Sequence, residues 1–122
     1  MAKILIVEDE PTLLTALVDK FAREGFTVLT AENGQNGLKS ALKNHPDLIL
    51  LDIIMPVMDG LTMLNKLRED GQDKHTKVIL LTNLSDPGKI PESVAKSVCG
   101  YLVKSDWKIE DVVKRVNKEL KK

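Results

Sequence analysis

Short apolar runs alternate along this chain with longer segments in which apolar residues recur at helical spacing. The runs cover residues 3–7, 26–30, 48–51, 77–81 and 100–103. Such alternation is typical of a parallel sheet that is covered on both faces by helices. We therefore predict an α/β fold of five parallel strands and five helices, with right-handed crossovers that place helices on both faces. The expected architecture is a doubly wound, flavodoxin-like sheet with strand order 2-1-3-4-5.

The segments between the runs carry the signals of individual helices. Apolar residues recur at helical spacing within residues 14–21, 38–42, 61–67, 90–98 and 109–120. The first helix should end before Gly25, and the second before Pro46, because proline cannot continue a helix. The fourth should begin near Pro91, after a loop over residues 83–90. Asp59 is placed to cap the third helix.

The length of the chain favours one small domain over residues 1–122. Eighteen basic residues balance eighteen acidic ones, so overall charge does not point to nucleic acid or to an anionic membrane. No signal-peptide core and no apolar stretch near the ~20 residues of a membrane span are visible, so we expect a cytoplasmic protein. Cys99 is expected to be a small apolar core residue, and His45 and His75 are expected to be exposed.

Chemically capable side chains come directly after four of the five apolar runs. Glu8 and Asp9 follow the first run, Asp52 the third, Thr82 the fourth and Lys104 the fifth. The carboxyl ends of parallel strands meet at one edge of a sheet, where ligands of such folds bind. Carboxylates hold hard divalent cations, and hydroxyl and ammonium groups donate to phosphate oxygens. The pattern therefore predicts a site for a divalent cation and a phosphoryl group.

Each of these residues also has a purely structural interpretation. Asp9 or Thr12 could cap the helix that follows, and Asp52 could cap a turn. Thr82 could be an ordinary strand residue, and Lys104 an exposed surface lysine. Their joint occurrence at the ends of successive strands favours the functional interpretation.

With these motifs assembled, the chain resembles the receiver domains of response regulators in two-component signalling, the CheY-like superfamily. The resemblance covers essentially the whole chain, and the motifs that carry it are Val7-Glu8-Asp9, Leu51-Asp52 through Met55-Pro56, Asp59-Gly60, Thr82 and Tyr101-Leu102-Val103-Lys104. It implies that Asp52 accepts a phosphoryl group. It also implies that Asp9, Asp52 and the Ile54 carbonyl hold Mg²⁺, with Glu8 reaching the ion through water.

The resemblance further implies a switch. Thr82 would turn its hydroxyl to a phosphate oxygen, Lys104 would pair with the phosphate or its acceptor, and Tyr101 would swing inward. The implied donor is a sensor histidine kinase or a histidine phosphotransfer protein. The implied recipient is a downstream effector or an output domain, which contacts the fourth helix, fifth strand and fifth helix. The domain itself would bind neither nucleic acid nor membrane, and it would be a phosphoacceptor rather than an enzyme.

Two positions depart from the family pattern. Ser105 follows Lys104 where relatives usually carry proline, and a cis bond to serine would cost roughly 2.5 to 4 kcal/mol. Asn83 follows Thr82 where the family prefers a small residue. We expect Asn83, together with Ile54, to modulate the lifetime of the phosphoryl group.

The sequence leaves three alternatives to this function. A phosphatase with an aspartate nucleophile needs a second acid two residues later, where this chain has Ile54. A nucleotide- or flavin-binding module needs a glycine-rich first turn, whereas residues 8–11 are largely acidic. The remaining alternative is a receiver-like scaffold that binds partners without phosphorylation.

Overall fold

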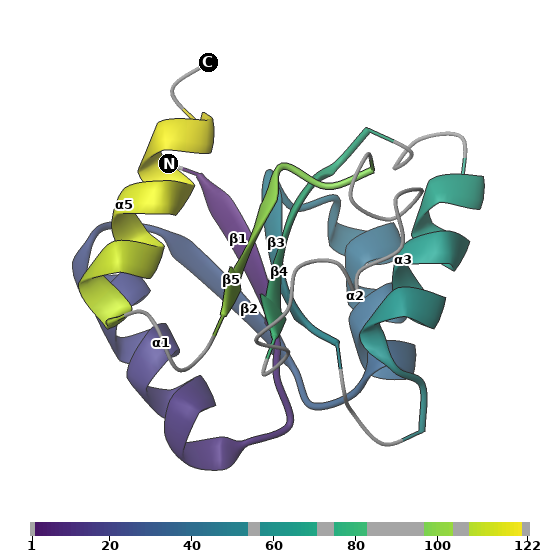
Figure 1. Cartoon of the computed structure of the whole chain (residues 1–122), viewed down its shortest axis with the longest axis horizontal. Coiled ribbons are helices and arrows are strands. Elements are labelled where there is room, and N and C mark those ends of the chain that lie inside the picture. Colours follow the sequence, from purple (N-terminus) through teal and green to yellow (C-terminus); the bar gives the residue numbers. More distant parts are fainter. Residues whose placement is uncertain (1, 54–56, 71–74, 83–96, 104–107, 121–122) are drawn as a thin grey trace.

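The computed structural model describes residues 2–53, 57–70, 75–82, 97–103 and 108–120 of the chain. Strands and helices alternate along residues 3–82, as Figure 1 shows. The elements in order are β1 (Lys3–Val7), α1 (Pro11–Arg23), β2 (Thr27–Ala31), α2 (Gly34–Asn44), β3 (Leu48–Asp52), α3 (Gly60–Glu69), β4 (Lys77–Thr82), β5 (Gly100–Val103) and α5 (Ile109–Leu120).

The strands form one parallel sheet in the order β2-β1-β3-β4-β5, which confirms the predicted topology. Helices α1 and α5 lie on one face, and α2 and α3 lie on the other (Figure 1). The described residues contain these four helices. The helix predicted to begin near Pro91 falls outside the described residues.

Burial on both faces explains why the strands appear in the sequence as unbroken apolar runs. In β1, Ile4 and Ile6 join the core cluster under α1 and α5, while Leu5 and Val7 join the cluster under α2 and α3. Every residue of β3 is buried. Side chains alternate between the two faces of a strand, so a strand with two covered faces needs apolar residues at every position.

Strands β2, β3 and β4 each end one residue later than their predicted runs, and the later start of β2 has a local cause. Strand β2 begins at Thr27 rather than at Phe26, because the amide of Phe26 donates to the Phe21 carbonyl at 3.1 Å instead of joining the sheet. The two phenyl rings also meet edge to face, with centroids 5.2 Å apart. The predicted helix ends are confirmed at Gly25, which has φ 92°, and near Pro46. No helix in the described part of the chain has the length and apolar character to cross a bilayer.

Candidate functional site

The strand register brings the predicted site residues to one edge of the sheet. Glu8 follows β1 and stands level with Asp52, because the residues that precede them are paired. Thr82 is the last residue of β4 and lies one position beyond the partner of Asp52. It pairs in turn with Val103, the last residue of β5. The carboxyl edge therefore carries Glu8, Asp9, Asp52 and Thr82, as the sequence predicted.

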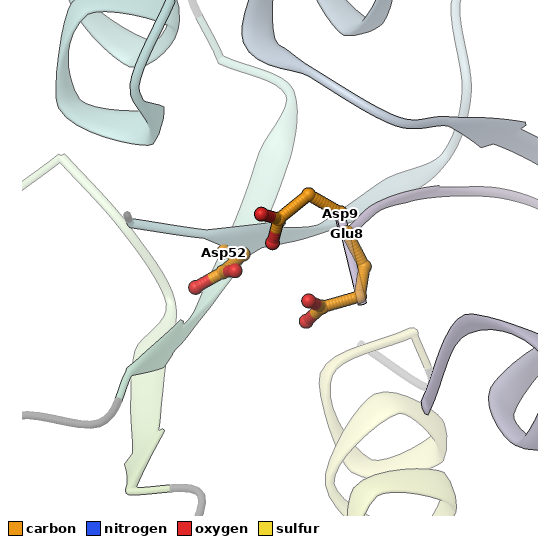
Figure 2. Close-up of side chains that lie close together, drawn as sticks. All are labelled: Glu8, Asp9 and Asp52. Atoms are coloured by element: carbon orange, nitrogen blue, oxygen red, sulfur yellow. The ribbon is translucent and has the colours of Figure 1, made fainter. Parts of the chain in front are cut away.

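The carboxylates of Glu8, Asp9 and Asp52 form a compact cluster at this edge. One oxygen from each lies within 4.8 Å of the others, and Figure 2 shows the three side chains ending in the same region. Glu8 is 0% exposed and Asp52 is 4% exposed, whereas Asp9 is open to solvent. Negative charges so close together repel one another, and removal from water adds to the cost of two of them.

Backbone contacts fix the acidic pair at the start of this cluster. The amide of Glu8 donates to the Ala31 carbonyl at 3.0 Å. The Glu8 carboxylate oxygen Oε2 accepts from the Glu10 amide at 3.1 Å. Glu10 is the N-cap of α1 and makes no side-chain capping bond. The alternative in which Asp9 or Thr12 caps this helix is therefore wrong. The Asp9 carboxylate is directed to the cluster instead.

The turn after β3 fixes the position of Asp52. The Gly60 amide donates to the Ile53 carbonyl at 2.8 Å, and a Cβ atom on Gly60 would lie 2.1 Å from the Asp52 carbonyl oxygen. Only glycine permits that approach. Asp59 accepts from the Thr62 amide at 2.8 Å, which confirms it as the cap of α3. The first turn of α3 is thus held directly against the end of β3.

A second glycine supports the same turn from α2. The Gly34 amide donates to the Met58 carbonyl at 2.9 Å, and a Cβ atom on Gly34 would lie 2.2 Å from that oxygen. Val57 precedes this contact with φ 69° and is 75% exposed, an unusual conformation for a β-branched residue. In the sequence Gly60 was marked only as part of the Asp59-Gly60 motif, and nothing there pointed to Gly34 as a positioning residue.

The remaining predicted residues divide by location. Tyr101 is half-buried in β5 and packs, with Val98, against the core cluster under α2 and α3. Ile54, Asn83 and Lys104 fall outside the described residues, as does Ser105. The roles assigned to them stay predictions.

The donor set and its size fit a hard divalent cation. Carboxylate oxygens are the ligands that Mg²⁺ prefers, at ~2.1 Å, so oxygens on opposite sides of the ion lie ~4.2 Å apart. Carboxylate oxygens within 4.8 Å of one another enclose a space of this size. A dication there would also offset the repulsion within the cluster.

A family model described as the response regulator receiver domain matches residues 4–117. The chain belongs to this family. Receiver domains are the phosphoacceptor domains of two-component signalling and are not enzymes in the usual sense. This agrees with an edge that combines clustered carboxylates with the threonine of the next strand.

Curated relatives of this receiver domain are longer response regulators. The domain is 36% identical over 112 residues to Response regulator PleD of Caulobacter vibrioides, an alignment that covers 92% of this chain and 24% of PleD. It is 34% identical over 122 residues to Response regulator ArlR of Staphylococcus aureus, covering 100% of this chain and 54% of ArlR. The chain therefore spans about a quarter to about half of the length of these relatives.

Solved structures share the whole fold of this receiver domain. Chemotaxis response regulator CheY4 of Vibrio cholerae superposes with a TM-score of 0.88 at 32% identity, covering 97% of this chain and 98% of CheY4. Response regulator TrrA of Thermotoga maritima, in complex with Mg²⁺-BeF, superposes with a TM-score of 0.83 at 33% identity, with the same coverage of both chains.

Proposed function

We propose that this receiver domain is a phosphorylation-dependent switch in which Asp52 accepts the phosphoryl group. The observation that carries the proposal is the cluster of Glu8, Asp9 and Asp52, whose carboxylate oxygens lie within 4.8 Å of one another at the carboxyl edge of the sheet. Asp52 occupies the end of β3, where the Gly60 contact fixes its backbone. A carboxylate whose backbone is held in place is suited to attack an incoming phosphorus atom.

In the proposed reaction an oxygen of Asp52 forms a bond to phosphorus while the bond from phosphorus to the donor's histidine nitrogen breaks. The imidazole leaves with the electron pair and takes up a proton. The product is an aspartyl phosphate, which is a covalent and reversible mark. The donor is a sensor histidine kinase or a histidine phosphotransfer protein.

Glu8, Asp9 and Asp52 are the residues that would hold Mg²⁺, together with the Ile54 carbonyl, and Glu8 would act through a water molecule. The ion supplies charge neutralisation, because both the attacking carboxylate and the phosphoryl oxygens are negative. Support comes from the donor set of this edge and from TrrA, which was solved in complex with Mg²⁺-BeF.

Strand β4, which is next to β3, and strand β5 beyond it lead to the residues proposed to detect the phosphoryl group. Thr82 ends β4 and would donate its hydroxyl to a phosphate oxygen, and Lys104, which follows β5, would pair with the phosphate. Movement of Thr82 would shift residues 83–90, and Tyr101 would turn further into the core. To shift the ratio of active to inactive protein from 1:99 to 99:1, phosphorylation must favour the active state by about 5.5 kcal/mol. Several charge-assisted contacts can supply this free energy.

The recipient of the signal is a downstream effector protein or an output domain. The proposed contact surface comprises the fourth helix, β5 and α5, since Thr82 and Tyr101 border it. Asn83 and Ile54, which flank Thr82 and Asp52 in the sequence, are proposed to set how long the phosphoryl group persists.

The test is to incubate the protein with Mg²⁺ and acetyl phosphate and to follow the intact mass. We expect the parent to gain one phosphoryl group, and we expect no gain for Asp52→Asn or for the parent in EDTA. Asp47→Asn is the matched control, because it neutralises an exposed aspartate at the opposite end of β3. A gain that persists in Asp52→Asn, or no gain in any sample, would rule out the proposed acceptor.

A further inference from the structure

Strand β2 forms one edge of the sheet, and its outer side is open in the described part of the chain, where β2 pairs with β1 alone. The Thr27 amide donates to the Ala2 carbonyl at 2.9 Å, and the Ala31 carbonyl accepts from the Glu8 amide at 3.0 Å. Thr27 and Ala31 therefore direct their peptide groups toward β1. Because this direction alternates along a strand, the N–H and C=O groups of Val28 and Thr30 point outward.

The β2 edge lacks the features by which exposed strands avoid pairing with other chains. Such features are charged side chains, proline, bulges and very short strands. Residues 26–31 contain neither a charge nor a proline, although 30% of the chain is charged. Strand β2 has five residues, the usual length, and it keeps an unbroken register with β1. Strands β1 and β3 are equally free of charge over their apolar runs, but each of them has a neighbouring strand on both sides.

We infer that β2 pairs in antiparallel fashion with β2 of a second copy of this chain, around a twofold axis at Leu29. In this register Val28 lies opposite Thr30 of the second copy, and Thr30 lies opposite Val28. Each of these two pairs exchanges two hydrogen bonds, as residues in a hydrogen-bonded antiparallel pair do. All the outward N–H and C=O groups of both β2 edges are then used.

The side chains and charges of the edge suit this self-pairing. Leu29, half-buried against the core cluster under α2 and α3, would lie beside Leu29 of the second copy. Val28, which packs on the opposite face, would lie beside Thr30, and cross-strand pairs of β-branched residues are favourable. Glu32 would lie opposite Phe26 and not opposite its own counterpart. No like charges therefore oppose one another along the paired strands.

The neighbouring registers are less favourable. An axis at Val28 would place Thr30 opposite Phe26, whose amide already donates to the Phe21 carbonyl at 3.1 Å. An axis at Thr30 would place Val28 opposite Glu32, which lies beyond the end of β2. Each copy has one β2 edge, so a twofold pair closes on itself and association should stop at the dimer.

The test uses Asp52→Asn protein in EDTA and a reducing agent, so that phosphoryl transfer, divalent cations and a disulfide at Cys99 cannot contribute. The pairing can then fail separately from the function proposed above. Sedimentation velocity from micromolar to millimolar concentration should show a reversible equilibrium between monomer and dimer. In amide hydrogen exchange, Val28 and Thr30 should gain protection as the dimer forms, whereas the Thr27 amide should be protected at every concentration.

Each other result of these two measurements would overturn the inference. A monomer at every concentration would show that the edge does not pair with itself. Oligomers larger than a dimer would contradict the twofold closure. A dimer in which the Val28 and Thr30 amides stay unprotected would have its interface elsewhere and would leave the β2 edge to a different partner.

Variants of Thr30 test the hydrogen bonds directly, because its side chain is exposed. Thr30→Pro removes one outward N–H from each copy, and proline is tolerated in an edge strand where the N–H faces solvent. It should weaken dimerisation about tenfold or more, because two hydrogen bonds are lost. Thr30→Ala keeps the amide and is the matched control, which should dimerise as the parent does.

Thr30→Lys is a second variant that leaves the backbone intact and adds a charge to the edge. It should also weaken dimerisation about tenfold, since charged side chains block edge pairing. Thr62→Lys makes the same change at an exposed position on α3 and should have no effect. A dimer that is as stable in Thr30→Pro and Thr30→Lys as in the two controls would overturn the inference.

Discussion

At the carboxyl end of the sheet Glu8, Asp9 and Asp52 crowd three carboxylates together, whereas at the amino end Arg68 and Lys77 line a pocket without a described acid. The formal charge of the chain is zero, so this separation is invisible in the composition. The two ends also differ in construction. Backbone contacts define the acidic end, while flexible side chains anchored to carbonyl oxygens define the basic one. We therefore expect the acidic end to tolerate substitution less well.

The largest loss of stability should come from a methyl group added at the acidic end, and the matched change adds a methyl group at the amino end. A Cβ atom on Gly60 would lie 2.1 Å from the Asp52 carbonyl oxygen, and one on Gly100 would lie 2.1 Å from the Arg115 guanidinium. Backbone cannot move aside without displacing β3, so Gly60→Ala should lower the free energy of unfolding by about 3 kcal/mol. Urea denaturation followed by circular dichroism measures this loss.

Gly100→Ala is the matched control for that substitution. Arg115 can swing away at the expense of its 2.9 Å hydrogen bond to the Cys99 carbonyl, so the loss should be about 1 kcal/mol or less. Equal losses for the two alanine variants would show that the two ends are equally rigid and would contradict the contrast.

A smaller change in the free energy of unfolding should follow when one charge is removed from the acidic end. Glu8→Gln retains the shape of a fully buried side chain and an oxygen for the Glu10 amide, but it removes one of three crowded charges. In EDTA we expect the free energy of unfolding to rise by about 1 kcal/mol, because repulsion is relieved. Stabilisation by Mg²⁺ should shrink, since it depends on affinity for the folded state.

Thermal unfolding with and without Mg²⁺ tests both statements. Glu24→Gln serves as the comparison, because neutralising this exposed acid at the C-cap of α1 should change stability by less than about 0.5 kcal/mol under either condition. If Glu8→Gln were destabilised in EDTA, or if it kept the full response to Mg²⁺, the crowded cluster would not be the source of the cation affinity.

The acidic end was predictable from sequence for a topological reason. Residues 48–51 form an apolar run because both faces of β3 are buried, and parallel strands then bring Asp52 beside Glu8 without further information. The start of β2 was misplaced by one residue because the amide of Phe26 bonds to α1, a contact that no periodicity encodes.

The basic end was not predictable in this way. Arg68, Lys77 and Ser97 come from three separate segments, and each resembles an ordinary surface residue in the sequence. The close backbone approaches of Gly34 and Gly60 were not predicted for the same reason, since each involves the backbone of another segment of the chain. Sequence patterns report periodicity and strand ends, and they do not report close approaches between distant segments.

The smallest expected effect concerns Cys99, which lines the pocket at the amino end of the sheet. Burial first, and then the charge of Glu119, raise the pKa of its thiol, although Lys77 and Arg68 act in the opposite direction. The folded thiol therefore keeps its proton at a pH where the unfolded thiol has ionised. As pH rises past the thiol's ordinary pKa, the parent should lose stability relative to Cys99→Ala.

Unfolding of the parent and Cys99→Ala, measured from neutral to mildly alkaline pH, tests the sign of this effect. Only the difference between the two pH profiles matters, because the alanine variant also loses packing. A parent that gained stability relative to Cys99→Ala as pH rose would show that Lys77 and Arg68 stabilise the thiolate. The two cations would then outweigh burial and the charge of Glu119 at Cys99. The amino end of the sheet would be more strongly electropositive than we expect.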